Sequence, residues 1–183
     1  MATLFINSCV RKESRTERIA KALLDRLGGT YEEVKLEIAG MQPLNGETLD
    51  ERTALIERGD YSAPMFDAAK QFAAADVIVI AAPFWDYSFP ALLKTYLENI
   101  YVTGIVSRYG SDGRPVGLCR AKKLYYVTTA GGPYVPTFSY DCVKALAQIA
   151  FGIPETELIA AEMLDVDGFD AEQIVADTIA KLA

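Results

Sequence analysis

The chain has 183 residues, 51% of them hydrophobic, and a net charge of −7. This length and composition fit one domain, residues 1–183, with a full core, and they exclude a disordered chain. The negative charge argues against nucleic acid as the partner, and no apolar run is long enough to span a membrane. The first ten residues, MATLFINSCV, lack the features of a signal peptide, so we expect a cytoplasmic protein.

The residue types limit the possible chemistry. The three cysteines, Cys9, Cys119 and Cys142, are widely spaced, so a disulfide framework, a zinc site or an iron–sulfur cluster is not expected. There is no histidine, which excludes Ser-His-Asp and Cys-His nucleophile schemes and imidazole metal sites. A bound cofactor could supply the reactive group that the side chains lack.

Strand and helix patterns alternate along the chain, with no internal repeat. In chain order, the expected elements are strand Thr3–Asn7, helix Ser14–Leu27, strand Tyr31–Leu36, helices Asn45–Arg58 and Asp67–Ala75, strand Val77–Ala82, helix Pro90–Val102, hairpin strands Val106–Tyr109 and Pro115–Leu118, strand Lys123–Thr129, helix Asp141–Phe151, strand Glu157–Leu164 and helix Asp170–Leu182. This alternation predicts an α/β fold, a doubly wound five-stranded parallel sheet of order 2-1-3-4-5 with helices on both faces.

Ligands bind such sheets where the strand order reverses, beyond the carboxyl ends of the strands. Here strands one and three flank that point. The loops after strands one, three and four are therefore expected to converge on one crevice. They are Ser8–Thr16, Pro83–Tyr87 and Thr128–Gly132.

The first loop ends at a predicted helix start that contains Ser14, Arg15 and Thr16. Backbone N–H groups lack partners at such a position, and two hydroxyls and a guanidinium add further donors, so the segment could cradle a phosphate. The alternative is a plain N-cap, because Ser14 and Glu17 have the spacing of a capping box. The segment alone does not decide between them.

The second loop, Pro83-Phe84-Trp85-Asp86-Tyr87, places three large aromatics between a buried strand and a helix. Such walls suit a flat, mostly apolar ligand with a polar edge. The alternative is that the rings simply cap the end of the sheet.

The third loop contains Gly131 and Gly132 directly after a buried strand. Two glycines there would let the backbone approach a ligand closely, or they would serve a turn that needs positive φ. Neither GxGxxG after strand one nor GxxxxGK[ST] is present, so neither a Rossmann dinucleotide site nor a P-loop is expected. The three loops together suggest a flat ring with a phosphate tail, a description that FMN fits.

Four motifs follow one another along the chain: NSCVRKESRTERIA, APFWDYSFPALLKTYLENI, SRYGSDGRPVGL and KKLYYVTTAGG. They resemble motifs of FMN-dependent NADH:azoreductases and related NAD(P)H:quinone oxidoreductases, which have a flavodoxin-like fold. The family pattern is an S-x-S/T helix start, a Pro-aromatic-aromatic-Asn-aromatic loop before an S-x-P-x-x-L-K helix, an F-R-Y…G-P-V-G-L hairpin and a strand ending in S/T-x-G-G.

The resemblance implies FMN held at its phosphate end by Ser8, Ser14, Arg15 and Thr16. Along the flavin ring it implies Pro83, Phe84, Trp85, Asp86 and Tyr87, and at the ring's other polar edge Thr129, Ala130, Gly131 and Gly132. It further implies a homodimer with two sites at the subunit interface. NADH or NADPH would reduce FMN, leave, and be replaced by a quinone, azo or nitroaromatic acceptor in a ping-pong cycle.

Three features depart from the family pattern. Asp86 replaces the usual Asn, and an anion near the flavin would disfavour its reduction. Ala130 replaces a larger residue, which would open the pocket, and the segment between strands two and three is short. Two alternatives stay open: a flavodoxin-type FMN electron carrier without organic-substrate turnover, whose T/S-x-T-G-x-T loop is absent here, and a cofactor-free interaction domain.

Overall fold

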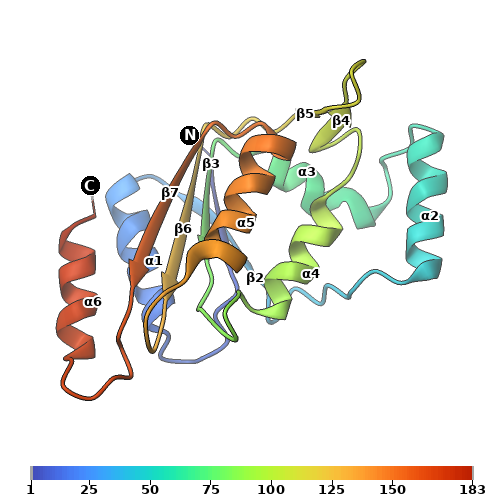
Figure 1. Cartoon of the computed structure of the whole chain (residues 1–183). Helices are drawn as coiled ribbons and strands as arrows, with labels where there is room; N and C mark the ends of the chain where they lie inside the picture. Colours follow the sequence, from blue (N-terminus) through green and yellow to red (C-terminus); the bar gives the residue numbers. More distant parts are fainter. Residues whose placement is uncertain (1, 183) are drawn as a thin grey trace.

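A five-stranded parallel sheet forms the centre of the computed structural model, which describes residues 2–182 (Figure 1). Its order is β2-β1-β3-β6-β7, which is the predicted order 2-1-3-4-5 once the two hairpin strands are left out of the count. The strands are β1 (Thr3–Asn7), β2 (Tyr31–Lys35), β3 (Val77–Ala81), β6 (Lys123–Thr129) and β7 (Glu155–Ala161). Residues 1 and 183, the ends of the predicted domain, lie outside the described residues.

Helices cover both faces of the sheet, as the alternating pattern predicts. On one face lie α1 (Arg15–Leu27) and α6 (Ala171–Ala180). On the other lie α3 (Asp67–Ala74), α4 (Ala91–Ile100) and α5 (Tyr140–Ala145). Every residue of β1 and β3 is buried, which explains their nearly continuous apolar sequences.

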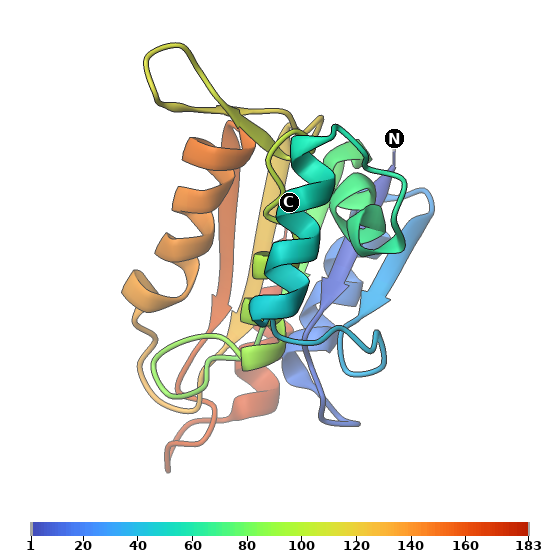
Figure 2. The same cartoon turned by 90° about the vertical axis from the view of Figure 1, so that its right-hand side faces the viewer.

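Two elements lie at the periphery. The helix α2 (Gly46–Glu57) has no buried residue and stands in front of the rest of the molecule in Figure 2. The predicted hairpin is confirmed as β4 (Ser107–Tyr109) and β5 (Pro115–Gly117). It projects from the end of the molecule at which the strands of the parallel sheet begin (Figure 1). No helix among residues 2–182 is both long and apolar enough to cross a bilayer.

The structure corrects two predicted elements. The last strand is Glu155–Ala161, not Glu157–Leu164, because Met163 has a φ of 66°, which a strand does not accommodate. The helix predicted at Asp141–Phe151 is α-helical only as far as Ala145 and continues as a π-helix over Leu146–Phe151. Side-chain periodicity does not distinguish these two helix types over such a short segment. The other predicted boundaries agree within one or two residues.

Candidate functional site

The carboxyl ends of the strands open onto a cleft of about 960 Å³. Its walls come from the start of α1, from the loops that follow β3 and β6, and from the segment that follows β7. The convergence predicted for three loops is therefore confirmed. Nine predicted site residues line the cleft: Ser14, Arg15, Thr16, Pro83, Phe84, Trp85, Thr129, Ala130 and Gly131.

The other four predicted residues, Ser8, Asp86, Tyr87 and Gly132, lie outside the lining of this cleft. Ser8 is fully buried, and its hydroxyl donates a hydrogen bond to the Ala81 carbonyl at 2.8 Å. That hydrogen bond ties the end of β1 to the end of β3. A role in binding FMN stays a prediction for these four residues, as it does for the nine that line the cleft.

The start of α1 is both an N-cap and a possible phosphate site, the two alternatives that the sequence leaves open. Ser14 is the N-cap, and its Oγ accepts a hydrogen bond from the Glu17 backbone N–H at 3.2 Å. The backbone N–H groups of Arg15 and Thr16 have no acceptor among residues 2–182. The cap thus satisfies one donor and leaves two for an anion, at the positive end of the helix dipole.

Glu17 does not complete the capping box. Its carboxylate instead pairs with Lys21 at 2.7 Å and with Lys35 of β2 at 2.8 Å. Burial alone would raise the pKa of Glu17, but hydrogen bonds from Lys21, Lys35 and Asn7 outweigh it and lower the pKa to about 2. Glu17 is therefore ionised at neutral pH and anchors α1 to the edge of the sheet.

Cys9, which also lines the cleft, is not a nucleophile at neutral pH. The residue is almost fully buried, and this burial raises the pKa of its thiol to about 11. The thiolate is the reactive form of cysteine, so the side chain acts here as a small apolar wall residue.

The aromatic loop is a tight turn. Trp85 and Ser88 exchange both backbone hydrogen bonds, at 2.9 and 2.8 Å, and the two residues between them have positive φ, 50° for Asp86 and 62° for Tyr87. This is the geometry of a type I′ turn, which favours Asn-Gly and costs a tyrosine about 1 kcal/mol or more. Phe84 and Trp85 line the cleft rather than only capping the sheet, which favours the binding interpretation.

The two glycines of the third loop differ from each other. Neither has positive φ, so the interpretation as a turn that requires glycine is wrong. A Cβ on Gly131 would lie 2.5 Å from the Asp165 Oδ2, whereas a Cβ on Gly132 would meet nothing within 4 Å. Gly131 therefore makes room for a carboxylate of the same chain.

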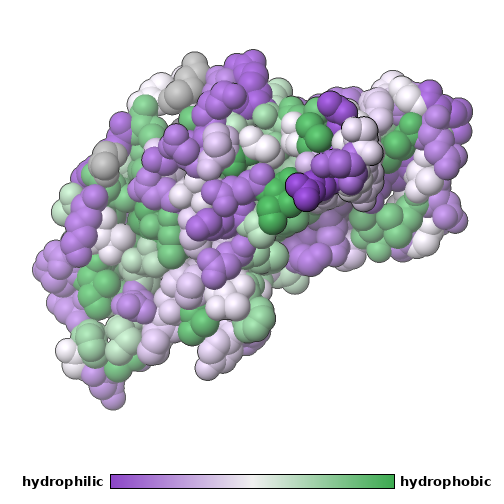
Figure 3. Space-filling view, turned by 45° about the horizontal axis from the view of Figure 1, so that its top comes forward, coloured by the Kyte–Doolittle hydropathy of each residue, from purple (hydrophilic) through white to green (hydrophobic). Residues whose placement is uncertain are grey.

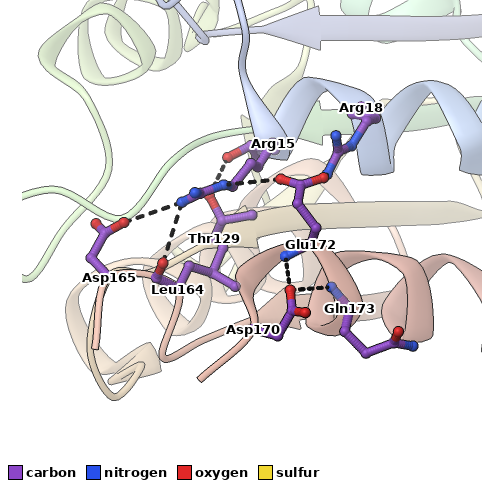
Figure 4. Close-up of polar contacts among 9 residues, drawn as sticks. Arg15, Arg18, Thr129, Leu164, Asp165, Asp170, Glu172 and Gln173 are labelled. Atoms are coloured by element: carbon purple, nitrogen blue, oxygen red, sulfur yellow. Dashed lines mark hydrogen bonds and ion pairs between the residues drawn. The ribbon is translucent and has the colours of Figure 1, made fainter. Parts of the chain in front are cut away.

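The structure adds wall residues that the sequence analysis missed. Leu164 and Asp165 follow β7, and Glu172 lies at the start of α6 (Figure 4). The predicted last strand ran to Leu164 and so concealed this fourth loop at the carboxyl end of the sheet. A strand ending at Ala161 would have placed Asp165 beside the other loops.

Comparison with known proteins agrees with this architecture. A family model described as a flavodoxin-like fold matches residues 1–183. An FMN-dependent NADH:quinone oxidoreductase 2 of Clostridium acetobutylicum is 46% identical over 118 residues, covering 62% of this chain and 58% of that protein. An FMN-dependent NADH:quinone oxidoreductase of Coprothermobacter proteolyticus is 32% identical over 179 residues, covering 92% of this chain and 88% of that protein. The chain spans 58% of the Clostridium acetobutylicum relative and 60% of a Clostridium beijerinckii relative.

Solved structures show the same fold. An azoreductase of Bacillus anthracis superimposes with a TM-score of 0.84 at 21% identity, covering 100% of this chain and 96% of the other. An FMN-dependent NADH-azoreductase of Bacillus anthracis in complex with FMN gives a TM-score of 0.80 at 20% identity, covering 99% and 95%. Since the family model matches the whole chain and one relative is matched over most of its length, the chain belongs to the flavodoxin-like family.

Proposed function

We propose that this chain is one FMN-binding domain that acts as an FMN-dependent NAD(P)H oxidoreductase on quinones, azo compounds or nitroaromatics. The observation that carries the proposal is a single cleft with two suitable ends. Free N–H groups and Arg15 at the start of α1 suit a phosphate, and Phe84 and Trp85 provide an aromatic wall. The names of the curated relatives and of the azoreductase structures support it.

The residues of the cleft divide between the two ends of the cofactor. Ser14, Arg15 and Thr16 would bind the phosphate, and Phe84 and Trp85 would pack along the ring. Thr129 is joined to Thr16 by a hydroxyl–hydroxyl hydrogen bond of 2.6 Å, so the loop after β6 is fixed to the helix start. Bound FMN would supply the hydride-transfer chemistry between nicotinamide and acceptor that the side chains of this chain lack. Phe84 and Trp85, which line the cleft, would orient the nicotinamide and the acceptor against the flavin ring.

We expect ping-pong kinetics, because donor and acceptor would use the same cleft in succession. The purified, FMN-loaded protein should lose its flavin absorption when NADH is added. Double-reciprocal plots of rate against NADH at several concentrations of a simple quinone should then be parallel. Intersecting lines would show that both substrates bind together. A flavin that NADH does not bleach would instead favour the electron-carrier alternative, and a protein that ignores FMN would favour the interaction domain.

We further propose that two copies of the chain form a homodimer beside the cleft. The face seen in Figure 3 mixes hydrophilic and hydrophobic residues. At the carboxyl end of the sheet, however, Tyr87 and Phe138 are 68% and 66% exposed. Their loops are joined by a 2.8 Å hydrogen bond from the Ser88 hydroxyl to the Phe138 carbonyl. Neighbouring exposed aromatics of this kind are typical of a partner surface.

Sedimentation at micromolar concentration should therefore show a dimer, and Phe138→Asp should shift it toward monomer. Ile38→Asp is the matched control, because Ile38 is 81% exposed but lies after β2 at the edge of the sheet. A monomer at every concentration would refute the shared interface.

We also propose a cytoplasmic location. Cys9, Cys119 and Cys142 are free thiols, as is usual for proteins in reducing compartments.

A further inference from the structure

The guanidinium of Arg15 is already held by groups of its own chain (Figure 4). Its Nη1 donates to the Asp165 Oδ1 at 3.1 Å and to the Leu164 carbonyl at 3.4 Å, and its Nε lies 3.7 Å from the Glu172 Oε1. Glu172 is also paired with Arg18 at 2.7 Å. The residue proposed to bind the FMN phosphate thus faces two carboxylates that line the same cleft.

The backbone around Asp165 is held in place. Backbone hydrogen bonds join Met163 N–H to the Gly132 carbonyl, Leu164 N–H to the Ala130 carbonyl and Asp165 N–H to the Gly131 carbonyl, at 2.9 to 3.2 Å. The Asp165 carboxylate lies over Gly131, where any larger residue would displace it. These hydrogen bonds fix the backbone of Asp165 at the wall of the cleft, within reach of Arg15.

The exposure of the two carboxylates favours the view that they compete with a phosphate for Arg15, rather than hold Arg15 in position for it. The side chains of Asp165 and Glu172 are 69% and 65% exposed, so each ion pair with Arg15 is weak and screened by salt. Such pairs contribute little to positioning the guanidinium. A phosphate dianion that binds Arg15 would nevertheless displace Asp165 from the guanidinium or share the guanidinium with it, and in the second case two anions would lie close together.

We propose that Asp165 competes with the phosphate of FMN for Arg15 and so sets how tightly the cleft retains a phosphorylated flavin. This inference rests on the proposed function. It makes Asp165 a specificity-determining residue for the phosphate end of the cofactor. Riboflavin has the same ring and ribityl chain but no phosphate, so Asp165 should not change the affinity of the cleft for riboflavin.

The test compares FMN with riboflavin in the wild-type protein and in Asp165→Asn. Each protein is loaded with either flavin and diluted, and the fluorescence of the released flavin gives the dissociation constant. Asp165→Asn should tighten FMN binding by about fivefold, the upper range for one exposed charge pair, and leave riboflavin binding unchanged. The gain should shrink at high salt.

Two matched variants separate the proposed mechanism from simpler ones. Asp167→Asn makes the same charge change in the same loop. Asp167 is exposed and forms no ion pair with any described residue, so this variant should leave the dissociation constants of both flavins unchanged. In an Arg15→Ala background, Asp165→Asn should lose most of its effect, because the shared partner is gone.

Three outcomes would overturn the inference while leaving FMN binding intact. Weaker FMN binding by Asp165→Asn would mean that Asp165 positions Arg15 for the phosphate. An unchanged FMN constant, or an equal change for riboflavin, would mean that Asp165 does not act at the phosphate. An undiminished gain in the Arg15→Ala background would mean direct repulsion without competition. A wild-type protein that retains neither flavin would refute the proposed function itself, and this inference with it.

Discussion

Replacing Glu17 by glutamine is expected to lower the free energy of unfolding at pH 7 by about 2–3 kcal/mol. Glu17 is 17% exposed and pairs with two lysines, of which Lys35 is itself only 25% exposed. Glu17→Gln keeps the shape of the side chain but leaves a half-buried ammonium group without its counter-charge, which is the costly way to break such a pair. The loss would loosen the contact between α1 and β2 beneath the helix start that forms the phosphate end of the cleft.

The effect must depend on pH in one direction. The folded-state pKa of Glu17, about 2, lies below its ordinary value of 4.5. The ionised form is therefore favoured by folding, and its contribution is fully present above pH 4.5 and lost as the pH falls from 4.5 to about 2. Urea unfolding at pH 7 and pH 3 should show that more than half of the difference between wild type and Glu17→Gln has disappeared at the lower pH.

Glu98→Gln is the matched control. Glu98 pairs with Lys94 one helical turn away on α4, and both side chains are about half exposed, so its removal should cost less than about 0.5 kcal/mol. Equal losses for Glu17→Gln and Glu98→Gln would contradict a special role for the pairing of Glu17. The same conclusion would follow if the cost of Glu17→Gln were as large at pH 3 as at pH 7.

The centre of the sheet could be predicted because β1 and β3 are buried on both faces. Val77–Ala81 has only apolar residues, and segments with a helical pattern of ordinary length lie between the successive strands of the chain. From this alternation the strand order and the switch point follow without any side-chain detail. The first, second and third loops could therefore be placed at one cleft before any contact was known.

The finer features of the site depend on contacts between distant residues, which a local pattern does not contain. The pattern around Gly131 indicates a turn residue or a ligand contact, but the space that a Cβ would occupy there is taken by the Asp165 carboxylate, thirty-four positions along the chain. The resemblance implies a role for Ser8 at the phosphate, and no sequence pattern indicates the hydrogen bond that its hydroxyl donates to the carbonyl of Ala81 in the adjacent strand. Sequence spacing identifies the loop, while the direction of each side chain follows from packing.

The hairpin motif SRYGSDGRPVGL is a second case in which the sequence identifies a segment but packing decides the role of its residues. It helped to identify the family resemblance, but the structure places it at the opposite end of the sheet from the cleft (Figure 1). Gly117 in this motif packs against the turn after the π-helix Leu146–Phe151, and the Cys119 backbone N–H donates to the Phe151 carbonyl at 3.2 Å. The glycine of the motif therefore has a packing role in this chain.

Gly117→Ala should consequently destabilise the protein by about 3 kcal/mol or more. The new Cβ would lie 2.1 Å from the Gly152 nitrogen and 2.2 Å from the Phe151 carbonyl carbon. Both neighbours are backbone atoms, so no side-chain rotation can relieve the overlap. Either the hairpin detaches from α5 and its π-helical extension, or the last turn of that helix is displaced, and thermal or urea unfolding should report a large loss.

Gly46→Ala serves as the control for the loss of a glycine. Gly46 is the first residue of α2, its φ is not positive, and an added Cβ would meet nothing within 4 Å. Alanine there should change stability by no more than about 1 kcal/mol, in the stabilising direction, because it favours the helix and restricts the unfolded chain. If Gly117→Ala were equally harmless, the contact between the two backbones could not be as close as the structure has it. Because the hairpin lies far from the cleft, a Gly117→Ala protein that remains folded at low temperature should still bind FMN with the wild-type affinity.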